Sequence, residues 1–252
     1  MTLINLRYFY FWRRNKMLRG GLLVQTKVTL IMTAVMIVIG TATFLIFEHD
    51  NTLASEHSLW LRFCLAFFHS ANARSGGLNA VDLESADPTT MFSYIGLMFV
   101  GGGSGSMAGG IKVTTFFVIL MSAWSVLCRR EDVQVFEHRI PANIIHIALM
   151  IGFLYAVCLS LGMLVLVSSE AGNVAVLELP HGWLGVIFDA VSAFGTVGLS
   201  SGAVGHMTVY GKIVLICMMY VGRILTLTLA VYLMRPWEKT HIKYPEETIS
   251  IG

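Results

Sequence analysis

Residues 100–114 read Val-Gly-Gly-Gly-Ser-Gly-Ser-Met-Ala-Gly-Gly-Ile-Lys-Val-Thr, and they interrupt a hydrophobic segment from residue 88 to residue 128 whose only charged residue is Lys112. A continuous helix over that segment would extend about 60 Å, whereas the hydrocarbon core of a bilayer is about 30 Å thick. The segment must therefore break, and the glycines predict where. Unwound backbone at membrane depth needs protein or a water-filled cavity around its polar groups. The stretch indicates a transport protein that lines an aqueous path through a bilayer.

The composition and the spacing of charges also indicate a membrane protein. Hydrophobic residues make up 56% of the chain and charged residues 13%, against about 45–50% and about 25% in soluble domains. Charges are absent from 28–47 and 140–169, and Arg223 is the only one in 213–234. Each of these segments is long enough to span a bilayer. We expect an all-α membrane protein with transmembrane spans at about 25–47, 88–127, 143–167 and 211–234.

The basic residues predict the orientation of the chain. They gather before residue 28, in 129–139 and in 235–243, whereas the intervening loops carry acidic residues. By the positive-inside rule the three basic regions are cytoplasmic. We therefore expect a multi-pass protein of the cytoplasmic (inner) membrane with both termini in the cytoplasm. For the basic N-terminal segment we expect the lipid bilayer, and no nucleic acid, as the partner.

The order of elements predicts an internal duplication. Each half has a span, a short apolar segment (59–69 or 183–194), a glycine-containing loop (70–82 or 195–205) and a second span. The short segments cannot cross a bilayer, so they must enter the membrane and return. The expected fold has two repeated helix–pore loop–helix units with four spans and two re-entrant half-helices, one span being interrupted by the glycine-rich loop. The predicted regions are a cytoplasmic N-terminal segment (1–24), a first unit (25–127), a cytoplasmic loop (128–142), a second unit (143–235) and a cytoplasmic tail (236–252).

The two loops between the half-helices and the following spans predict an ion filter. Residues 70–78 match 192–199 with an offset of one residue, although turns rich in glycine and serine also match by chance. Backbone carbonyls can replace the water shell of a cation, and glycine permits the necessary conformations. Thr196-Val197-Gly198 also resembles the Thr-Val-Gly of potassium-channel filters. We expect K+ at the backbone carbonyls of Gly77 and Gly198; the alternative is a pair of ordinary external turns. The predicted filter residues are Ala73, Arg74, Ser75, Gly76, Gly77, Gly195, Thr196, Val197 and Gly198.

The glycine-rich stretch admits three interpretations. A phosphate-binding loop would have lysine directly after its last glycine, but Ile111 intervenes and no soluble strand precedes the loop. A helix-packing face would use the glycines spaced four apart at 101, 105 and 109. A flexible intramembrane gate accounts better for the other glycines and serines. The predicted gating loop comprises Gly101, Gly102, Gly103, Ser104, Gly105, Ser106, Gly109, Gly110 and Lys112.

Three single residues carry further expectations. Arg223 lies about ten residues from either end of its span, roughly 15 Å from each interface, so it should face the bundle interior. It either makes a structural hydrogen bond to the gating loop or acts as an electrostatic latch below the filter. Lys112 lies nearer the cytoplasmic end, and we expect it to reach the lipid headgroups. His69 either faces an external vestibule or has a structural role.

The residues in the spans do not suggest covalent chemistry. The eight histidines and four cysteines are scattered, without spacing typical of a metal site or of a disulfide framework. The spans contain no nucleophile–base pair. The sequence therefore predicts a transport protein and not an enzyme.

Four stretches resemble the TrkH/KtrB/HKT superfamily of potassium transporters, and the KtrB group most closely. They are 73–79 for the third filter loop, 101–115 for the gating loop, 192–198 for the fourth filter loop and 221–223 in the last span, and the tail at 242–252 is similar as well. The resemblance implies four span–pore–span units around one pore, with Gly77 and Gly198 as the filter glycines of the third and fourth units. It also implies that Arg223 is the pore-facing arginine of the family.

The resemblance further implies a bacterial potassium-uptake system. KtrB-like proteins are homodimers on a cytosolic, nucleotide-binding regulatory ring (KtrA-type), and their K+ uptake often depends on Na+. The chain departs from the family in having two units instead of four, so an N-terminal half or a second copy is needed to complete the pore. It also reads Ile-Leu-Thr-Leu-Thr after Arg223, where relatives usually have a Gly-Pro pair.

Two rival functions fit the same sequence. One is an alternating-access carrier that uses the broken span as its substrate site. The other is a non-conducting assembly subunit. The expectation that we carry forward is the pore-forming subunit, or half-subunit, of a potassium-uptake system.

Overall fold

The computed structural model describes residues 23–54, 58–81, 83–103, 106, 108–130, 132–136 and 138–233. The predicted N-terminal segment (except residues 23 and 24) and the predicted C-terminal tail lie outside the described residues. Ser104 and Gly105 of the predicted gating loop also lie outside them.

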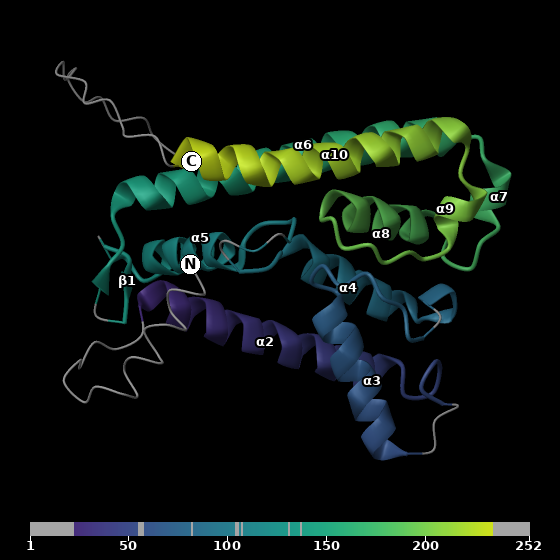
Figure 1. Cartoon of the computed structure of the whole chain (residues 1–252), viewed down its shortest axis with the longest axis horizontal. Coiled ribbons are helices and arrows are strands. Elements are labelled where there is room, and N and C mark those ends of the chain that lie inside the picture. The colour runs from purple at the N-terminus through teal and green to yellow at the C-terminus, as the bar shows by residue number, and fades with distance from the viewer. Residues whose placement is uncertain are drawn as a thin grey trace.

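Helices dominate the described residues (Figure 1). In chain order the elements are α2 (Val24–Phe47), α3 (Leu59–Asn72), the 3₁₀ turn η1 (Leu83–Ser85), α4 (Pro88–Phe99), α5 (Val113–Leu127), β1 (Gln134–Val135), β2 (His138–Arg139), α6 (Ala142–Glu170), α7 (Val174–Leu177), α8 (Gly182–Phe194), α9 (Ala203–His206) and α10 (Val209–Leu233).

The helices match the apolar segments of the sequence within a few residues. Among the described residues, α2 and α6 are long and apolar enough to cross a membrane, each with a mean hydropathy of 2.5. α10 has 25 residues. The segment predicted to break does so, because α4 ends at Phe99 and α5 begins at Val113. The last helix, which lacks the Gly-Pro pair after Arg223, continues without interruption to Leu233.

The structure differs from the prediction at several short elements. α3 continues to Asn72, so residues 70–72 are helical and not part of the loop. The loop between α5 and α6 contains the antiparallel β1–β2 hairpin, and Arg139 of β2 forms an ion pair at 2.7 Å with Asp132, just before β1. The hairpin strands and the helices α7 and α9 are too short to produce a recognisable periodic pattern.

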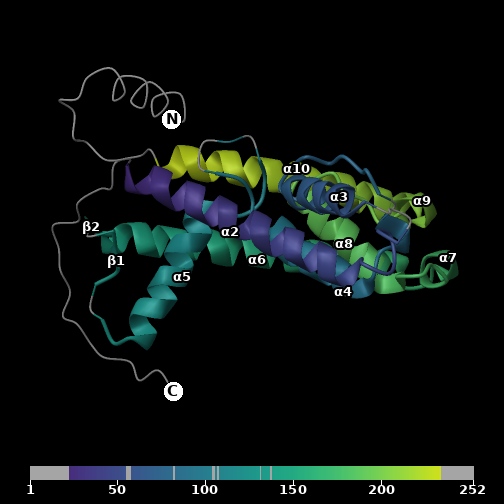
Figure 2. The same cartoon turned by 90° about the horizontal axis from the view of Figure 1, so that it is seen from below.

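The elongated molecule has two ends, and the long helices begin and end near them. The start of α2, the β1–β2 hairpin and the end of α10 lie at one end in both views, and α7 and α9 lie at the other (Figures 1 and 2). The hairpin between α5 and α6 therefore lies at the end of the molecule where α2 begins and α10 ends.

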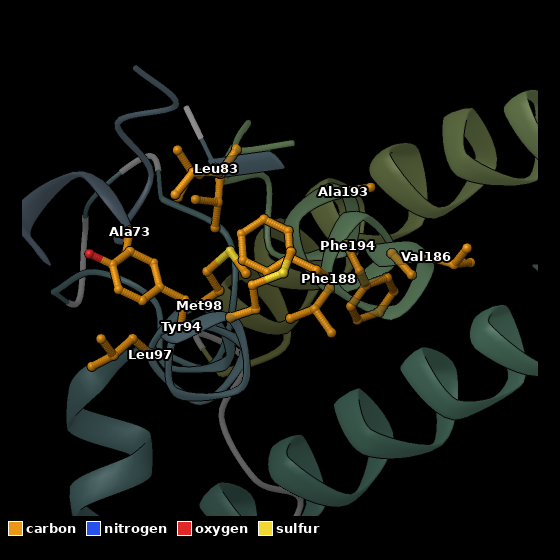
Figure 3. Close-up of a cluster of buried hydrophobic side chains, with 14 of the residues drawn as sticks. Ala73, Leu83, Tyr94, Leu97, Met98, Val186, Phe188, Ala193 and Phe194 are labelled. Atoms are coloured by element: carbon orange, nitrogen blue, oxygen red, sulfur yellow. The ribbon is translucent and has the colours of Figure 1, made fainter. Parts of the chain in front are cut away.

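The core is centred on α8. This helix packs against α4, α6 and α10, and nearly all its residues from Gly185 to Phe194 are buried. Figure 3 shows Met98 of α4 beside Phe188 of α8, whereas Tyr94 of α4 lies on the other side of Met98, near Ala73. By contrast, α3 exposes one face that consists of Leu59, Trp60, Leu61, Phe63, Phe67 and Phe68. The two half-length helices therefore occupy different environments.

Two buried carboxyl groups hold the ends of the long helices in the same way. Glu48 follows α2 and accepts hydrogen bonds from the backbone N–H of Asp87 at 2.8 Å and the Thr52 hydroxyl at 2.8 Å. Glu170 ends α6 and accepts from the backbone N–H of Thr208 at 3.0 Å. Both glutamates are fully buried. Asp87 and Thr208 immediately precede α4 and α10, so each carboxyl group lies at the positive end of a helix dipole.

An asparagine accompanies each glutamate three positions later in the sequence. Asn51 Nδ2 donates to the carbonyl oxygen of Ser85 at 2.6 Å. Asn173 Nδ2 donates to the carbonyl oxygen of His206 at 2.9 Å. The acceptor lies two residues before the N–H that each glutamate binds. We refer to these two Glu-x-x-Asn contacts as the clasps.

Asp87 also caps α4 through its own side chain. Its carboxylate accepts the N–H of Thr89 at 2.7 Å, and the hydrogen bonds with Thr89 lower the pKa of Asp87. Pro88 at the first helical position leaves no unsatisfied N–H there. The start of α4 is therefore determined by the local sequence and by the clasp together.

The clasp at Glu170 predicts a stability effect. Glu170→Gln would turn an amide NH₂ group toward partners that are themselves donors, Thr208 and Asn173, and should destabilise the protein by about 1–3 kcal/mol. Thermal unfolding of the purified protein in detergent measures the change. Glu178→Gln is the matched control, because Glu178 is exposed. Equal unfolding temperatures for the two variants would contradict a stabilising clasp.

Candidate functional site

The two loops predicted as filter have the same alternation of backbone conformation. Ser75 and Gly77 have φ values of 84° and 65°, and Thr196 and Gly198 have 51° and 93°. Left-handed conformations are costly for serine and threonine, so surrounding contacts must maintain them. The loops differ by one residue, because Arg74 lies between the helix cap Ala73 and Ser75, whereas Thr196 follows the helix cap Gly195 directly. We call residues 73–78 and 195–199 the pore loops.

The structure brings Gly77 and Gly198 together. A β-carbon added to Gly77 would lie 2.8 Å from the carbonyl oxygen of Val197, and one added to Gly198 would lie 3.2 Å from the Cα of Gly77. Both glycines have positive φ values, so a side chain would be strained as well as crowded. The two pore loops thus place unobstructed backbone side by side.

Two side chains that the sequence analysis missed hold the first pore loop and the segment that directly follows the second. Asn72 bonds both polar groups of Leu78: its Nδ2 donates to the carbonyl oxygen, and its Oδ1 accepts the N–H. Asp189, buried in α8, accepts the N–H of Ser201 at 2.7 Å and that of Val204 at 3.2 Å. Neither residue has a local pattern that signals this role, because the partners lie in irregular backbone.

The glycine-rich segment is a closed loop and not a helix in its described residues. Its ends are joined by backbone hydrogen bonds from Gly101 to Ile111 at 2.6 Å, from Ile111 to Phe99 at 3.2 Å and from Val113 to Gly102 at 3.2 Å. The helix-packing interpretation of its glycines is therefore wrong, since residues 100–103 and 108–112 are not helical. We call residues 100–112 the gating loop, as a name for the segment.

The gating loop contacts both pore loops. The guanidinium group of Arg74 donates to the carbonyl oxygens of Thr33 at 3.3 Å and Gly101 at 3.4 Å. The N–H of Gly109 donates to the Thr196 hydroxyl at 3.0 Å. A β-carbon on Gly109 would overlap Gly195 and Thr196, so this close approach requires glycine.

The structure corrects the expectation for Lys112. Its Nζ donates to the carbonyl oxygens of Ser106 at 2.9 Å and Ala108 at 2.7 Å, so it does not extend to lipid headgroups. These carbonyl oxygens lie four and six residues away in the same loop, and buried carbonyls are costly unless a donor binds them. Arg223, half-buried on α10, lies close enough to Lys112 for the two positive charges to interact. The neighbouring Gly222 packs against the carbonyl of Phe194 at the end of α8.

His69 does not face a vestibule. It is fully buried and stacks on Phe44, with ring centroids 5.2 Å apart and planes 2° apart. Neither ring nitrogen has a hydrogen-bond partner within the described part of the chain. In the described part of the chain, His69 therefore packs α3 against α2.

A cavity of about 350 Å³ lies behind the second pore loop. It is lined by Asp189, Ser192, Ala193, Thr196, Gly198, Leu199, Ser200, Val204, Leu215 and Met219. Most of this lining is apolar. In the described residues, no group of three or more His, Cys, Asp or Glu side chains could hold a metal ion.

Long apolar helices, two pore loops in contact and a broken helix between them are features of a membrane protein that transports cations. The comparison with known families agrees: the TrkH family, described as cation transport protein, matches residues 5–241. The chain belongs to the TrkH family.

Individual relatives have similar names. The chain is 36% identical over 245 residues to the Ktr system potassium uptake protein B of Vibrio alginolyticus, covering 96% of this chain and 51% of the relative. It is 34% identical over 232 residues to the Bacillus subtilis protein of the same name, covering 90% and 49%. The potassium/sodium uptake protein NtpJ of Enterococcus hirae is 30% identical over 230 residues, covering 90% and 50%. The chain spans about half the length of these curated relatives.

A solved structure has the same fold. The crystal structure of the potassium transporter TrkH from Vibrio parahaemolyticus superposes with a TM-score of 0.59 at 18% identity, covering 84% of this chain and 44% of that chain. The relatives are transport proteins, which agrees with the prediction of a transporter.

The contact of Gly222 with the end of α8 predicts a packing effect. Gly222→Ala would push its β-carbon into the carbonyl of Phe194 and should destabilise the protein by about 1–3 kcal/mol. Gly96→Ala is the matched control: Gly96 is helical and no described atom lies within 4 Å of its added β-carbon, so it should be neutral or stabilising by up to about 1 kcal/mol. Thermal unfolding measures both. The close approach would be refuted if the two variants unfolded together.

Proposed function

We propose that this chain is the pore-forming subunit, or half of one, of a Ktr/Trk-type system for K+ uptake across the bacterial cytoplasmic membrane. The observation that carries the proposal is the contact of Gly77 with Gly198, two left-handed glycines from separate loops. Rings of backbone carbonyls select and conduct cations in known filters. The names of the relatives, potassium uptake proteins, support K+ as the ion.

The same geometry supports a filter and a gate. The pore loops supply backbone oxygens that a dehydrated K+ ion could bind, and the gating loop lies directly against them through Gly109 and Thr196. Lys112 within the gating loop and Arg223 on α10 supply positive charge, which would oppose the passage of a cation. No covalent chemistry is needed for this function. Na+ is the proposed coupling ion, in keeping with the name of the Enterococcus relative.

The repeated clasps support two span–pore–span units. Each clasp joins the end of the first long helix of a unit to the start of the helix after its pore loop. The half-length helices α3 and α8 have 14 and 13 residues, about 20 Å, which is too short to cross a bilayer. We therefore assign them as re-entrant pore helices.

The exposed face of α3 supports an incomplete pore. Its counterpart α8 is enclosed by three helices, whereas α3 leaves Trp60, Phe63 and Phe67 stacked in a row on the surface. An N-terminal half, or a second copy of the chain, would cover this face and complete a four-sided filter. A homodimer on a cytosolic nucleotide-binding ring, with both termini in the cytoplasm, completes the proposed assembly.

Uptake measurements test the proposal directly. The chain is expressed in a bacterium that lacks K+ uptake, together with the N-terminal half of a relative, and growth on low K+ and uptake of Rb+ are measured. Gly77→Asp and Gly198→Asp should each reduce uptake at least about tenfold, because each puts a strained side chain into the filter. Gly205→Asp is the matched control, since Gly205 is exposed and its added β-carbon meets no described atom within 4 Å.

The outcomes distinguish the rival functions. Unchanged uptake in either filter variant would refute the filter. Saturable uptake of an organic solute without Rb+ flux would indicate an alternating-access carrier. A stable protein that carries no ion with any partner half would indicate an assembly subunit.

Removing the gating loop should increase flux. Deletion of residues 104–109 takes away the proposed gate together with the contact of Gly109 with Thr196, so Rb+ uptake should rise above that of the unaltered chain. The same assay and partner half are used, with protein level in the membrane as the control. Lower flux at an unchanged protein level would show that the loop serves packing and does not gate.

A further inference from the structure

Two hydrogen bonds join the gating loop to the pore loops, one from each unit. Arg74 of the first pore loop reaches the carbonyl of Gly101, near the start of the gating loop. Thr196 of the second accepts the N–H of Gly109, near its end. We propose that Arg74 and Thr196 are positioning residues that hold the gating loop against the filter, so that movement of the loop and the shape of the filter are coupled. This inference rests on the proposed function.

The position of Arg74 is specific to the first pore loop. Apart from this residue, the two loops have matching caps and matching left-handed positions. The additional residue carries the guanidinium group that bridges Thr33 of α2 and Gly101. The duplicated loops thus differ at the place where one of them gains a contact to the gating loop.

The position of Thr196 links the contact to the filter backbone. Thr196 has a φ of 51°, which is costly for a β-branched residue, and it lies two residues before Gly198. Its hydroxyl is the acceptor for Gly109. A shift of Gly109 would therefore act on a strained residue of the pore loop, and a change of the pore loop would act on Gly109.

The two contacts are of the strength expected for a reversible link. A hydrogen bond between neutral groups, such as the one from Gly109 to Thr196, stabilises a contact by a factor of about three to ten. The Arg74 contacts, at 3.3 and 3.4 Å, are long. Arg74 Nε is buried without a partner in the described residues, so the side chain retains an unused donor. Such contacts hold the loop in place and still permit release.

The first experiment measures the position of the gating loop without relying on transport. The four cysteines are replaced, Ser106→Cys is introduced in the exposed part of the loop, and its rate of modification by N-ethylmaleimide is measured on the full chain in lipid–detergent micelles. Thr196→Val removes the acceptor and should raise the rate about three- to tenfold, and Thr196→Ser should restore it. Arg74→Gln should raise the rate about twofold or more.

A second thiol position controls for general loosening. Ala148, on α6, is only 4% exposed and lies outside the site, so Ala148→Cys is the control position. Its modification rate should not change with Thr196→Val or Arg74→Gln. If the Ser106→Cys rate stays constant in both variants, or if the Ala148→Cys rate rises equally, the proposed link is wrong. Arg74→Gln provides the test if Thr196→Val fails to fold.

The second experiment adds the Rb+ uptake assay. Thr196→Val should change uptake more strongly in the full chain than once residues 104–109 are deleted, because part of its effect would act through the loop. An equal effect in both backgrounds would overturn the coupling. Increased thiol rates in a protein with no Rb+ uptake in any form would support the link and refute the proposed function, so the two failures are distinguishable.

Discussion

The structure depends on the hydrogen bonds that an unwound, glycine-rich backbone makes inside a bundle of apolar helices. Polar peptide groups that are removed from water without hydrogen bonds are costly, more so in a membrane. Here the gating loop closes on itself through Gly101, Ile111 and Val113, and Lys112 binds two of its carbonyls. The remaining contacts come from the pore loops. The segment can therefore stay unwound between α4 and α5 only because distant parts of the chain converge on it.

The sequence predicts the helices well because long apolar runs determine them. It also predicts the break between α4 and α5, since a helix through that segment would be too long for a bilayer. The similarity of the pore loops is visible in the sequence, but the meeting of Gly77 and Gly198 is not, because no local pattern encodes a contact between loops of different units. The filter and gate assignments remain predictions.

The contacts that the sequence analysis missed are polar and non-local. Glu48 and Glu170 bind N–H groups 39 and 38 positions away, across a half-length helix and a loop. A signal did exist, because Glu-x-x-Asn follows the first span of both units. The prediction for Lys112 was wrong for a related reason: lysine tends to extend to the membrane surface, but here its Nζ binds carbonyl oxygens of its own loop. Residues such as Asn72 and Asp189 require the folded loops before their partners can be recognised.

The clasps have a consequence for how such a chain can be built. All the hydrogen bonds of the Glu48 clasp stay within residues 48–87, and those of the Glu170 clasp stay within 170–208. Each clasp thus uses residues of its own unit, while the two units also touch where His181 Nε2 lies 2.9 Å from the carbonyl oxygen of Glu84. A gene segment that encodes one unit therefore encodes both the buried glutamate of its clasp and the donors that bind it. Such a segment can be copied, fused or separated without leaving that carboxyl group without hydrogen-bond partners.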